Sequence, residues 1–504
     1  MILNLYFLNS YDRKGGAANE TIDPCFLLAL LVILFAMGAE IFLPNENSRV
    51  YHHTAAADAA YCDSVAEGEF CTHLPLVVIN TAGQALDFET EILAELSVTD
   101  NEGGHNHLSG DPTLETDMLI KMRGNSSSRF DKKQYRLTFV DTEGYDPQTD
   151  DLQNLLHVSH PVMGMSSESE WVLNGPFLDK TLLRNYLMYN LSGEIMDWAP
   201  NVRYCEVILD GEYLGVYLML ETVKVDEDRV DLNKLNPQNT GTSYMLSRER
   251  VGDTAYPLNN FGTYSGKTYN ELGVVYPGAR SGRTEEHLEY VRQDISAFER
   301  MLYSLDYDHQ ERGYKSAIDV QSFVDYFLLN EFSMNVDGGG LSTYIHKDLR
   351  SGFVMGPVWD FNNGFDNYEY YTMDYDEFYL ISKPWYVMLL RDEQFVEQVI
   401  TRYAQLRQGV LSEEKIMTVI DETIAFLGPA LERNEEKWGY SYDDGWLDNM
   451  DTKFQPLSYD RNPDNHAHAV EQLKESIQRR GRFLDEYIHV LRQFCAESKV
   501  KEWN

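Results

Sequence analysis

The sequence predicts an α+β fold with an antiparallel, strand-rich first half and a mostly helical second half. Short apolar runs with strand character follow one another from Leu74 onward, and Asp210-Gly211 between two of them is a strong β-hairpin signal. Beyond residue 320 the apolar residues recur at helical spacing instead. With 504 residues, 43% hydrophobic and 12% aromatic, the chain can build a large core and is not a mainly disordered protein.

The first half is expected to be an antiparallel sheet with one inserted helix. The expected strands are residues 74–80, 118–122, 135–140, 171–174, 202–209 and 213–220. The helix is expected over residues 179–196, where Leu183, Leu187 and Leu191 return to one face.

The second half begins with a deeply buried helix. Residues 320–332 are apolar nearly all round, which is typical of a helix inside a core. A glycine-rich loop follows at residues 338–340, and then a hairpin is expected with strands at 343–345 and 353–355. From Trp385 the chain is expected to be mostly helical, ending in an apolar stripe between Val470 and Leu491.

The N-terminal region predicts an extracytoplasmic protein. Residues 26–39 form an uninterrupted apolar run, which is short for a membrane span of about 20 residues but suits a signal peptide. We therefore expect residues 1–44 to be a signal peptide or a signal anchor inserted in a membrane, with a buried core helix as the alternative. Residues 45–73 are expected to be a linker, and the remainder to be secreted or membrane-anchored.

The charge and cysteine content argue against two kinds of function, nucleic-acid binding and zinc binding. The chain carries 42 Lys and Arg against 81 Asp and Glu, a net charge of −39, which argues against nucleic-acid binding. Such acidity fits a basic partner or metal-rich surroundings. The five cysteines show no zinc-ligand spacing, although Cys62 and Cys71 could close a small loop in an oxidising compartment.

Two carboxylates could carry chemistry. Asp337 follows the buried helix and Asp360 follows the hairpin, which can fold back and bring them together. One carboxylate near an acceptor hydroxyl and one holding a divalent metal on phosphate oxygens is the pattern that phosphoryl transfer needs. The structural alternative is that Asp337 starts a glycine turn and Asp360 caps the next segment.

A basic loop is the second candidate. The segment Arg123-Gly124-Asn125-Ser126-Ser127-Ser128 joins two expected strands and is followed by Arg129, Lys132, Lys133 and Arg136. Small residues let backbone N–H groups approach a phosphate, and the cations neutralise it. A solvated turn with charges that protect an edge strand is the alternative. The sequence contains neither a Walker loop nor a Gly-x-Ser-x-Gly hydrolase motif.

Taken together, these segments resemble the spore coat protein H (CotH) kinase family. The matching pieces occur in the family's order over about residues 74–490. They are Arg123 to Ser127, Lys132 to Leu137, Trp171 to Asn174, the Asp210-Gly211 hairpin ending at Glu221, Asn330-Glu331, Asn335-Val336-Asp337, Ser342-Thr343-Tyr344, Lys347-Asp348, and Gly356-Pro357-Val358-Trp359-Asp360-Phe361-Asn362.

The resemblance implies an atypical protein-kinase-like bilobal fold that transfers the γ-phosphoryl group of ATP to protein Ser or Thr with Mg²⁺ or Mn²⁺. It implies an N-lobe over residues 74–250 and a C-lobe over residues 251–504. Asp337 would be the catalytic aspartate, beside Asn335, and Asp360 would hold the metal with Asn362. The nucleotide would contact Arg123, Asn125, Ser126, Ser127, Lys132, Lys133, Arg136 and Glu221, the last of which ends the strand that leads to the adenine side.

The chain departs from the family pattern near the expected site. It reads Gly364-Phe365-Asp366-Asn367 where family members often have Gly-Phe-Gly-Asn, and an acidic, aromatic insertion follows at residues 368–378. Residues 243–248 lack the acidic residue expected after the hinge-side strand.

Two further readings remain open. One is a non-catalytic surface adhesin or scaffold on the same fold, and the other is a metal-dependent phosphoesterase. For a kinase, the acidity predicts Lys/Arg-rich Ser/Thr substrates.

Overall fold

The computed structural model describes residues 49–55, 69–101, 104–368, 370–443, 445 and 461–496. These residues lie within one unit, Asn47–Asn504. The predicted signal segment 1–44 lies outside the described residues. In the part that is described, no helix is long and apolar enough to cross a membrane. Strands and helices are both abundant, which confirms the predicted α+β class.

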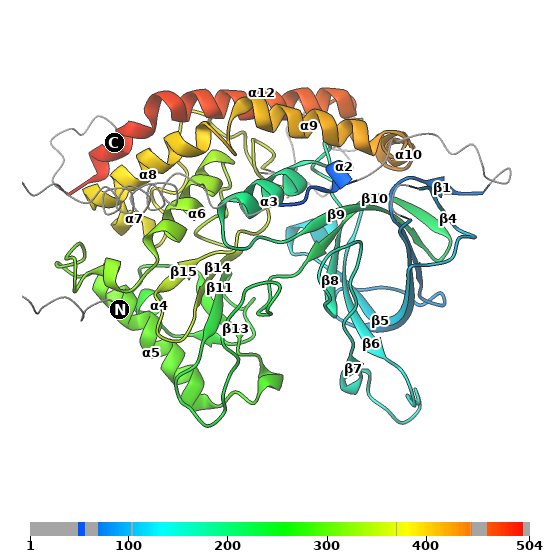
Figure 1. The fold of residues 1–504 in the computed structure, drawn as a ribbon, viewed down its shortest axis with the longest axis horizontal. Helices are drawn as coiled ribbons and strands as arrows, with labels where there is room; N and C mark the ends of the chain where they lie inside the picture. The colour runs from blue at the N-terminus through cyan, green and yellow to red at the C-terminus, as the bar shows by residue number, and fades with distance from the viewer. Residues whose placement is uncertain are drawn as a thin grey trace, which may run out of the picture. The chain divides into compact units, whose positions relative to one another are not determined.

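The first half folds into an eight-stranded sheet that closes on itself, because β5 pairs with both β3 and β6 (Figure 1). The strand order is β5-β3-β2-β9-β10-β8-β6-β7. The strands are β2 (Leu76–Asn80), β3 (Ile92–Thr99), β5 (Leu114–Arg123), β6 (Gln134–Asp141), β7 (Leu156–His157), β8 (Glu170–Asn174), β9 (Val202–Leu209) and β10 (Glu212–Glu221).

One pair in this sheet corrects the antiparallel prediction. β2 and β9 run parallel, with Leu76 opposite Glu206. A parallel pair needs a long crossover connection, and the strands and helix between β2 and β9 provide it. The turn after β9 secures the pair, because the Asp210 carboxylate accepts hydrogen bonds from the N–H (2.7 Å) and Oγ1 (2.5 Å) of Thr81.

The predicted hairpin is confirmed, and its strands are buried on both faces. Asp210 and Gly211 have φ values of 47° and 82°, as the turn of a two-residue hairpin requires. Alternate residues of β9 and β10 point to opposite sides. Cys205 and Tyr217 belong to the core inside the closed sheet, whereas Tyr204 and Leu218 belong to the larger core on its helical side.

The second half contains a five-stranded antiparallel sheet of order β12-β13-β11-β14-β15. Its strands are β11 (Tyr244–Glu249), β12 (Pro257–Leu258), β13 (Glu271–Tyr276), β14 (Thr343–Lys347) and β15 (Phe353–Met355). The predicted hairpin is β14–β15. β11 lies between β13 and β14. The boundary expected between the two lobes, at residue 250, therefore falls between this strand and both of its partners along the sequence.

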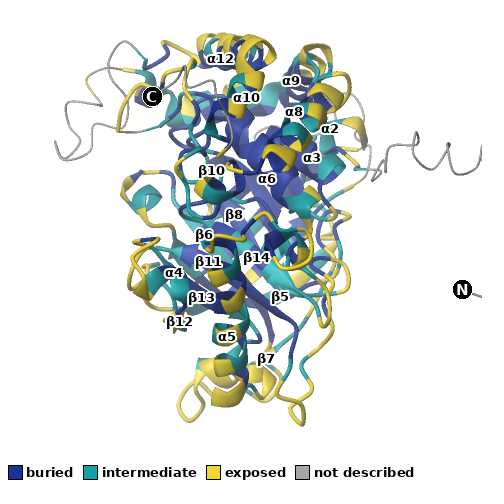
Figure 2. Cartoon of the chain, turned by 90° about the vertical axis from the view of Figure 1, so that its left-hand side faces the viewer, coloured by how far each residue is buried: buried dark blue, intermediate teal, exposed yellow. Residues whose placement is uncertain are grey.

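The helices α8, α9, α10 and α12 lie on one side of both sheets, α5 lies beside the smaller sheet, and α6 lies in the interior (Figures 1 and 2). α6 has the predicted bounds, and the Asp319 carboxylate caps it by accepting the Ser322 N–H at 2.9 Å. α3 begins later than predicted, because residues 179–183 form a turn around the Asp179 side chain. The helices of at least ten residues are α3 (Arg184–Ile195), α5 (Glu285–Leu302), α6 (Val320–Phe332), α8 (Glu393–Arg407), α9 (Glu413–Leu427), α10 (Pro429–Trp438) and α12 (His466–Tyr487).

Part of the predicted linker packs against α3. Arg49 donates hydrogen bonds to Asn190 Oδ1 (3.1 Å) and to the Ala199 carbonyl (2.8 Å), and Tyr51 donates to Glu194 Oε1 at 2.6 Å. The short helix α2 (His52–Ala55) follows, and β1 (Cys71–Thr72) pairs with β4 (Asn106–His107). Cys71 is disulfide-bonded, while Cys205 and Cys495 are buried and form no disulfide. α4 (Phe261–Tyr264) and α7 (Tyr386–Leu389) are single turns.

Candidate active site

A polar cleft of about 730 Å³ lies between the closed sheet and the α6–β15 region. A volume of this order suits a nucleotide-sized ligand. Segments that are far apart in the sequence line it: the end of β5 and the loop after it, β6, the start of α3, the end of β11, and the loops after α6 and β15. The predicted site residues that line it are Arg123, Asn125, Ser126, Ser127, Arg136, Asp337, Asp360 and Asn362.

Asn335 joins the two candidate aspartates through their backbones. Its Nδ2 donates to the Asp360 carbonyl at 3.2 Å, and its Oδ1 accepts the Asp337 N–H at 3.3 Å. Asn335 is buried and is also held by Asn330 Oδ1 at 3.0 Å. It therefore acts on the position of the aspartates, which face the cleft, and does not line the cleft itself.

The loop that carries Asp360 has a constrained backbone. Asp360 has a φ of 61°, a left-handed conformation that non-glycine residues adopt rarely. Two buried side chains hold it in place. Tyr189 Oη accepts the Asp360 N–H at 3.1 Å, and Asn185 Oδ1 accepts the Phe361 N–H at 2.8 Å.

The donor atoms near Asp360 fit a divalent metal. Asn362 Oδ1 is buried and has no hydrogen-bond partner among the described residues. Carboxylate and amide oxygens are hard ligands that Mg²⁺ accepts, and Mg²⁺ usually takes one or two carboxylates together with substrate phosphates. In the described part of the chain no three His, Cys, Asp or Glu side chains cluster as a metal site. Asp360 and Asn362 would thus need phosphate and water oxygens to complete the shell.

The loop after β5 offers small residues and cations to the same cleft. Gly124 has a φ of 113°, and a Cβ there would lie 2.1 Å from Ser127 Oγ, so only glycine allows this turn. Arg123 lies over the Trp359 ring at 5.9 Å and donates to Gln134 Oε1 at 3.3 Å. Arg136 pairs with Glu170 at 2.7 Å while its side chain stays partly exposed to the cleft.

Besides Asn335, three of the predicted residues do not line the cleft. Lys132 is buried on the opposite side, where its Nζ donates to the Val216 carbonyl (2.6 Å) and to Asn434 Oδ1 (2.9 Å). Lys133 instead donates to the Ser128 carbonyl at 2.8 Å and braces the loop. Glu221 is fully buried and accepts hydrogen bonds from Ser166 and Asn201. Its neighbour Leu220 lines the cleft in its place, because adjacent strand residues point to opposite faces.

Two residues that the sequence analysis did not single out belong to the site. Glu249 ends β11, directly after the segment in which an acidic residue was expected, and lines the cleft. Burial raises the pKa of Glu249 to about 7. The Lys383 Nζ donates to the Val336 carbonyl next to Asp337, and burial lowers the pKa of Lys383 while the Asp337 charge opposes that shift. The sequence signal that could have indicated Lys383 is its place as a single lysine after the acidic insertion at residues 368–378.

The fold and the cleft define an α+β protein in which two aspartates and a small-residue loop with arginines face one nucleotide-sized site. The model of the CotH kinase protein family matches residues 120–484, and the chain belongs to this family. This confirms the resemblance drawn from the motifs. The chain is also similar to inner spore coat protein H of Bacillus subtilis (strain 168), with 23% identity over 260 residues. That alignment covers 49% of this chain and 58% of the relative, so the chain spans little more than half of the relative's length.

Proposed function

We propose that this chain is an atypical protein kinase that transfers the γ-phosphoryl group of ATP to Ser or Thr of a protein. The observation that carries the proposal is the Asn335 bridge, which positions Asp337 and Asp360 together in the cleft that also receives the Arg123–Ser128 loop. The proposal includes a protein-kinase-like bilobal division. The closed sheet supplies the phosphate loop, and the helix-rich part supplies the aspartates.

The chemistry asks for positioning and charge neutralisation more than for covalent catalysis. Asp337 would accept the proton of the acceptor hydroxyl while the oxygen of that hydroxyl bonds to the γ-phosphorus. The bond from that phosphorus to the β–γ bridging oxygen breaks, and ADP leaves. Asp360 and Asn362 would hold Mg²⁺ or Mn²⁺, which neutralises phosphate charge when bound. Arg123 and Arg136 would neutralise the remaining phosphate charge. The apolar side chains of the cleft, including Leu220, would cover the adenine base of ATP.

Transfer of label from γ-labelled ATP tests the proposal. The full chain is incubated with Mg²⁺ or Mn²⁺ beside Asp337→Ala and Asp360→Asn. Glu436→Gln serves as the control, since Glu436 is exposed on α10 and lies outside the cleft. We expect label on protein with the wild type and the control, and none with either aspartate variant.

Other outcomes would support the rival functions. Free labelled phosphate with no labelled protein would favour a metal-dependent phosphoesterase. Neither label nor metal-dependent ATP binding by calorimetry would favour a non-catalytic adhesin or scaffold.

The compartment and the acceptor complete the proposal. An extracytoplasmic or coat location is supported by the Cys71 disulfide and by the similarity to an inner spore coat protein. Fractionation with an antibody would test it, and recovery of the chain in the cytosol alone would contradict it. A Lys/Arg-rich Ser/Thr substrate is supported by the net charge of −39. A basic serine peptide should therefore be labelled faster than an acidic one.

A further inference from the structure

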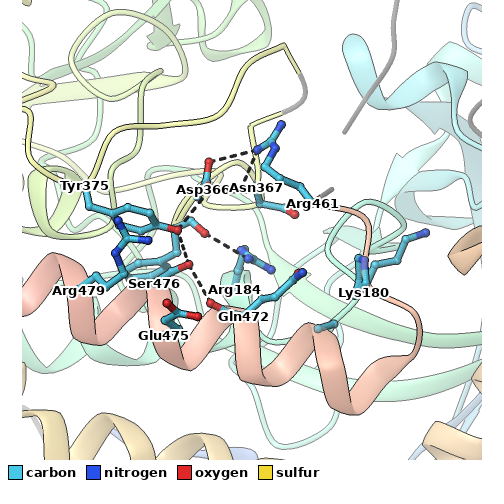
Figure 3. Close-up of a pocket in the computed structure, with 13 residues that line it drawn as sticks. Lys180, Arg184, Asp366, Asn367, Tyr375, Arg461, Gln472, Glu475, Ser476 and Arg479 are labelled. Atoms are coloured by element: carbon cyan, nitrogen blue, oxygen red, sulfur yellow. Dashed lines mark hydrogen bonds and ion pairs between the residues drawn. The ribbon is translucent and has the colours of Figure 1, made fainter. Parts of the chain in front are cut away.

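A second cavity lies apart from the cleft, between the segment after Asp360 and helix α12 (Figure 3). Its volume is about 130 Å³, well below the ~300–1,000 Å³ typical of sites for drug-sized ligands. It is too small for a nucleotide, but it can hold one small oxyanion or a few water molecules. Phe365, Asp366 and Asn367 form part of its wall.

The cavity is lined by four cations: Lys180, Arg184, Arg461 and Arg479. Two carboxylates also line it. One of them, Asp366, is already engaged by Arg461 at 3.1 Å and by the Tyr375 hydroxyl at 3.2 Å. The other, Glu475, is exposed. Asp179 pairs with Arg184 at 2.7 Å, so four cations stand against three carboxylates here, in a chain whose net charge is −39.

The buried cations are held in place before any ligand binds. Arg184 donates to Asp179 Oδ1 (2.7 Å) and to the Gly364 carbonyl (2.9 Å). Lys180 Nζ donates to Ser441 Oγ at 2.5 Å. Burial lowers the pKa of Lys180 to about 7, so an anion nearby would favour its charged form. Preorganised cations of this kind bind oxyanions without a large ordering cost.

Two groups at the cavity have unused donor capacity. Arg461 donates through both terminal nitrogens to Asp366 and Tyr368, but its Nε is buried and has no hydrogen-bond partner among the described residues. Arg479 is exposed at the rim and contacts the Tyr375 ring at 4.1 Å. Its guanidinium is thus available to a ligand that enters from solvent.

We propose that this cavity is a binding site for a phosphate-class oxyanion, supplied either as free phosphate or as a phosphoryl group on a side chain. The site touches the candidate metal loop from behind. Arg184 holds the Gly364 carbonyl, and the next residue, Asn185, holds the Phe361 N–H on the cleft side. An anion bound to Arg184 would therefore change the position of the loop that carries Asn362. This regulatory consequence rests on the proposed function, whereas the binding itself does not.

Calorimetry with inorganic phosphate tests the site in the full chain, at low salt and without nucleotide or metal. Arg479→Gln removes the rim cation. Arg482→Gln is the matched control, because Arg482 is exposed on the same helix and lines neither cavity. We expect Arg479→Gln to weaken binding roughly tenfold, the order of one charge-assisted hydrogen bond, and Arg482→Gln to leave it unchanged. Equal melting temperatures without phosphate would show that both variants fold.

Arg136→Gln distinguishes phosphate binding in this cavity from phosphate binding in the cleft, because Arg136 lines only the cleft. Binding that survives Arg136→Gln and falls in Arg479→Gln supports the proposal. Loss in Arg136→Gln with none in Arg479→Gln overturns it, as does the absence of phosphate binding by the wild type.

Two further arms identify the source of the oxyanion and its independence of catalysis. A phosphoserine peptide that competes with inorganic phosphate would identify a phosphorylated side chain as a ligand, and absence of competition would identify free phosphate. Asp360→Asn should still bind phosphate, so a failed kinase assay and a failed anion site are distinguishable.

Discussion

Arg480 offers the sharpest test of how the site region is held together. It is fully buried on α12 and pairs with the equally buried Glu331 of α6 at 2.5 Å. Its guanidinium also donates to the carbonyls of Tyr375 (2.7 Å), Glu377 (2.6 Å) and Glu331 (3.0 Å). Glu331 in turn accepts the N–H groups of Tyr379 and Leu380, both at 2.8 Å. This pair therefore fixes the segment that leads to Lys383.

Arg480→Met should be strongly destabilising. It leaves a buried carboxylate without its cation and removes the Arg480 hydrogen bonds to the Tyr375 and Glu377 carbonyls, and the loss of one partner of a buried pair costs about 3–5 kcal/mol. A change of 1 kcal/mol shifts Tm by ~2–4 °C in a domain of 150–250 residues and by less in a larger one, so we expect a fall of about 3–10 °C. Arg480→Lys should lie between, since it keeps the charge but loses the planar fork.

Thermal unfolding followed by circular dichroism measures the effect, with Arg482→Met as the exposed control on the same helix. The control should stay within about 0.5 kcal/mol of the wild type. A second variant, Arg480→Met with Glu331→Gln, should recover part of the loss because it removes the unpaired charge. A melting temperature of Arg480→Met equal to that of the control would refute the reasoning.

Three other predictions concern the site and its surroundings. Gly124→Ala, whose Cβ would lie 2.1 Å from Ser127 Oγ, should weaken ATP binding by calorimetry roughly tenfold or more, or about 1.4 kcal/mol. Gly144→Ala, also at positive φ but with open space around it, should not weaken it. Lys383→Met should lower kcat more than it raises the KM for ATP, because Lys383 lies beside Asp337, and Lys234→Met at an exposed site should change neither. Burial lowers the pKa of Lys132 to about 7, below its value in the unfolded chain, so the unfolded state binds more protons above pH 7. The free energy of unfolding should therefore rise with pH from about 7 to 10 more steeply in the wild type than in Lys132→Met, by up to ~1.4 kcal/mol per pH unit, and parallel curves in denaturant titrations would contradict this.

Local signals explain which elements could be predicted. The Asp210-Gly211 turn and the all-round apolar pattern of α6 depend on neighbouring residues only, and both appear with the predicted bounds. The sequences of β9 and β10 are nearly continuous apolar runs because both faces of these strands are covered. The two aspartates could be placed together for the same reason, since a short hairpin separates them.

The remainder depends on contacts that no local pattern encodes. Lys132 and Lys133 are adjacent, and the side on which each lies is decided by Asn434 of α10, about 300 residues later. β11 was not recognised as a strand because it carries a buried Arg248, which lies over the Trp385 ring at 4.3 Å and interrupts the apolar pattern. The second cavity lies between residues 180–184 and α12, so the cations that line it are far apart along the sequence.

The parallel pair β2–β9 sets an order of events for folding. β2, β3, β5 and β6 pair antiparallel with their neighbours along the chain, so they can form as the chain emerges. Leu76 and Glu206 are far apart along the chain, and closing a flexible loop of that length costs about 4 kcal/mol in loop entropy. Until that loop closes, β2 presents an unpaired edge that invites association with other chains. A nascent chain therefore depends on protection of that edge until residues 202–221 become available.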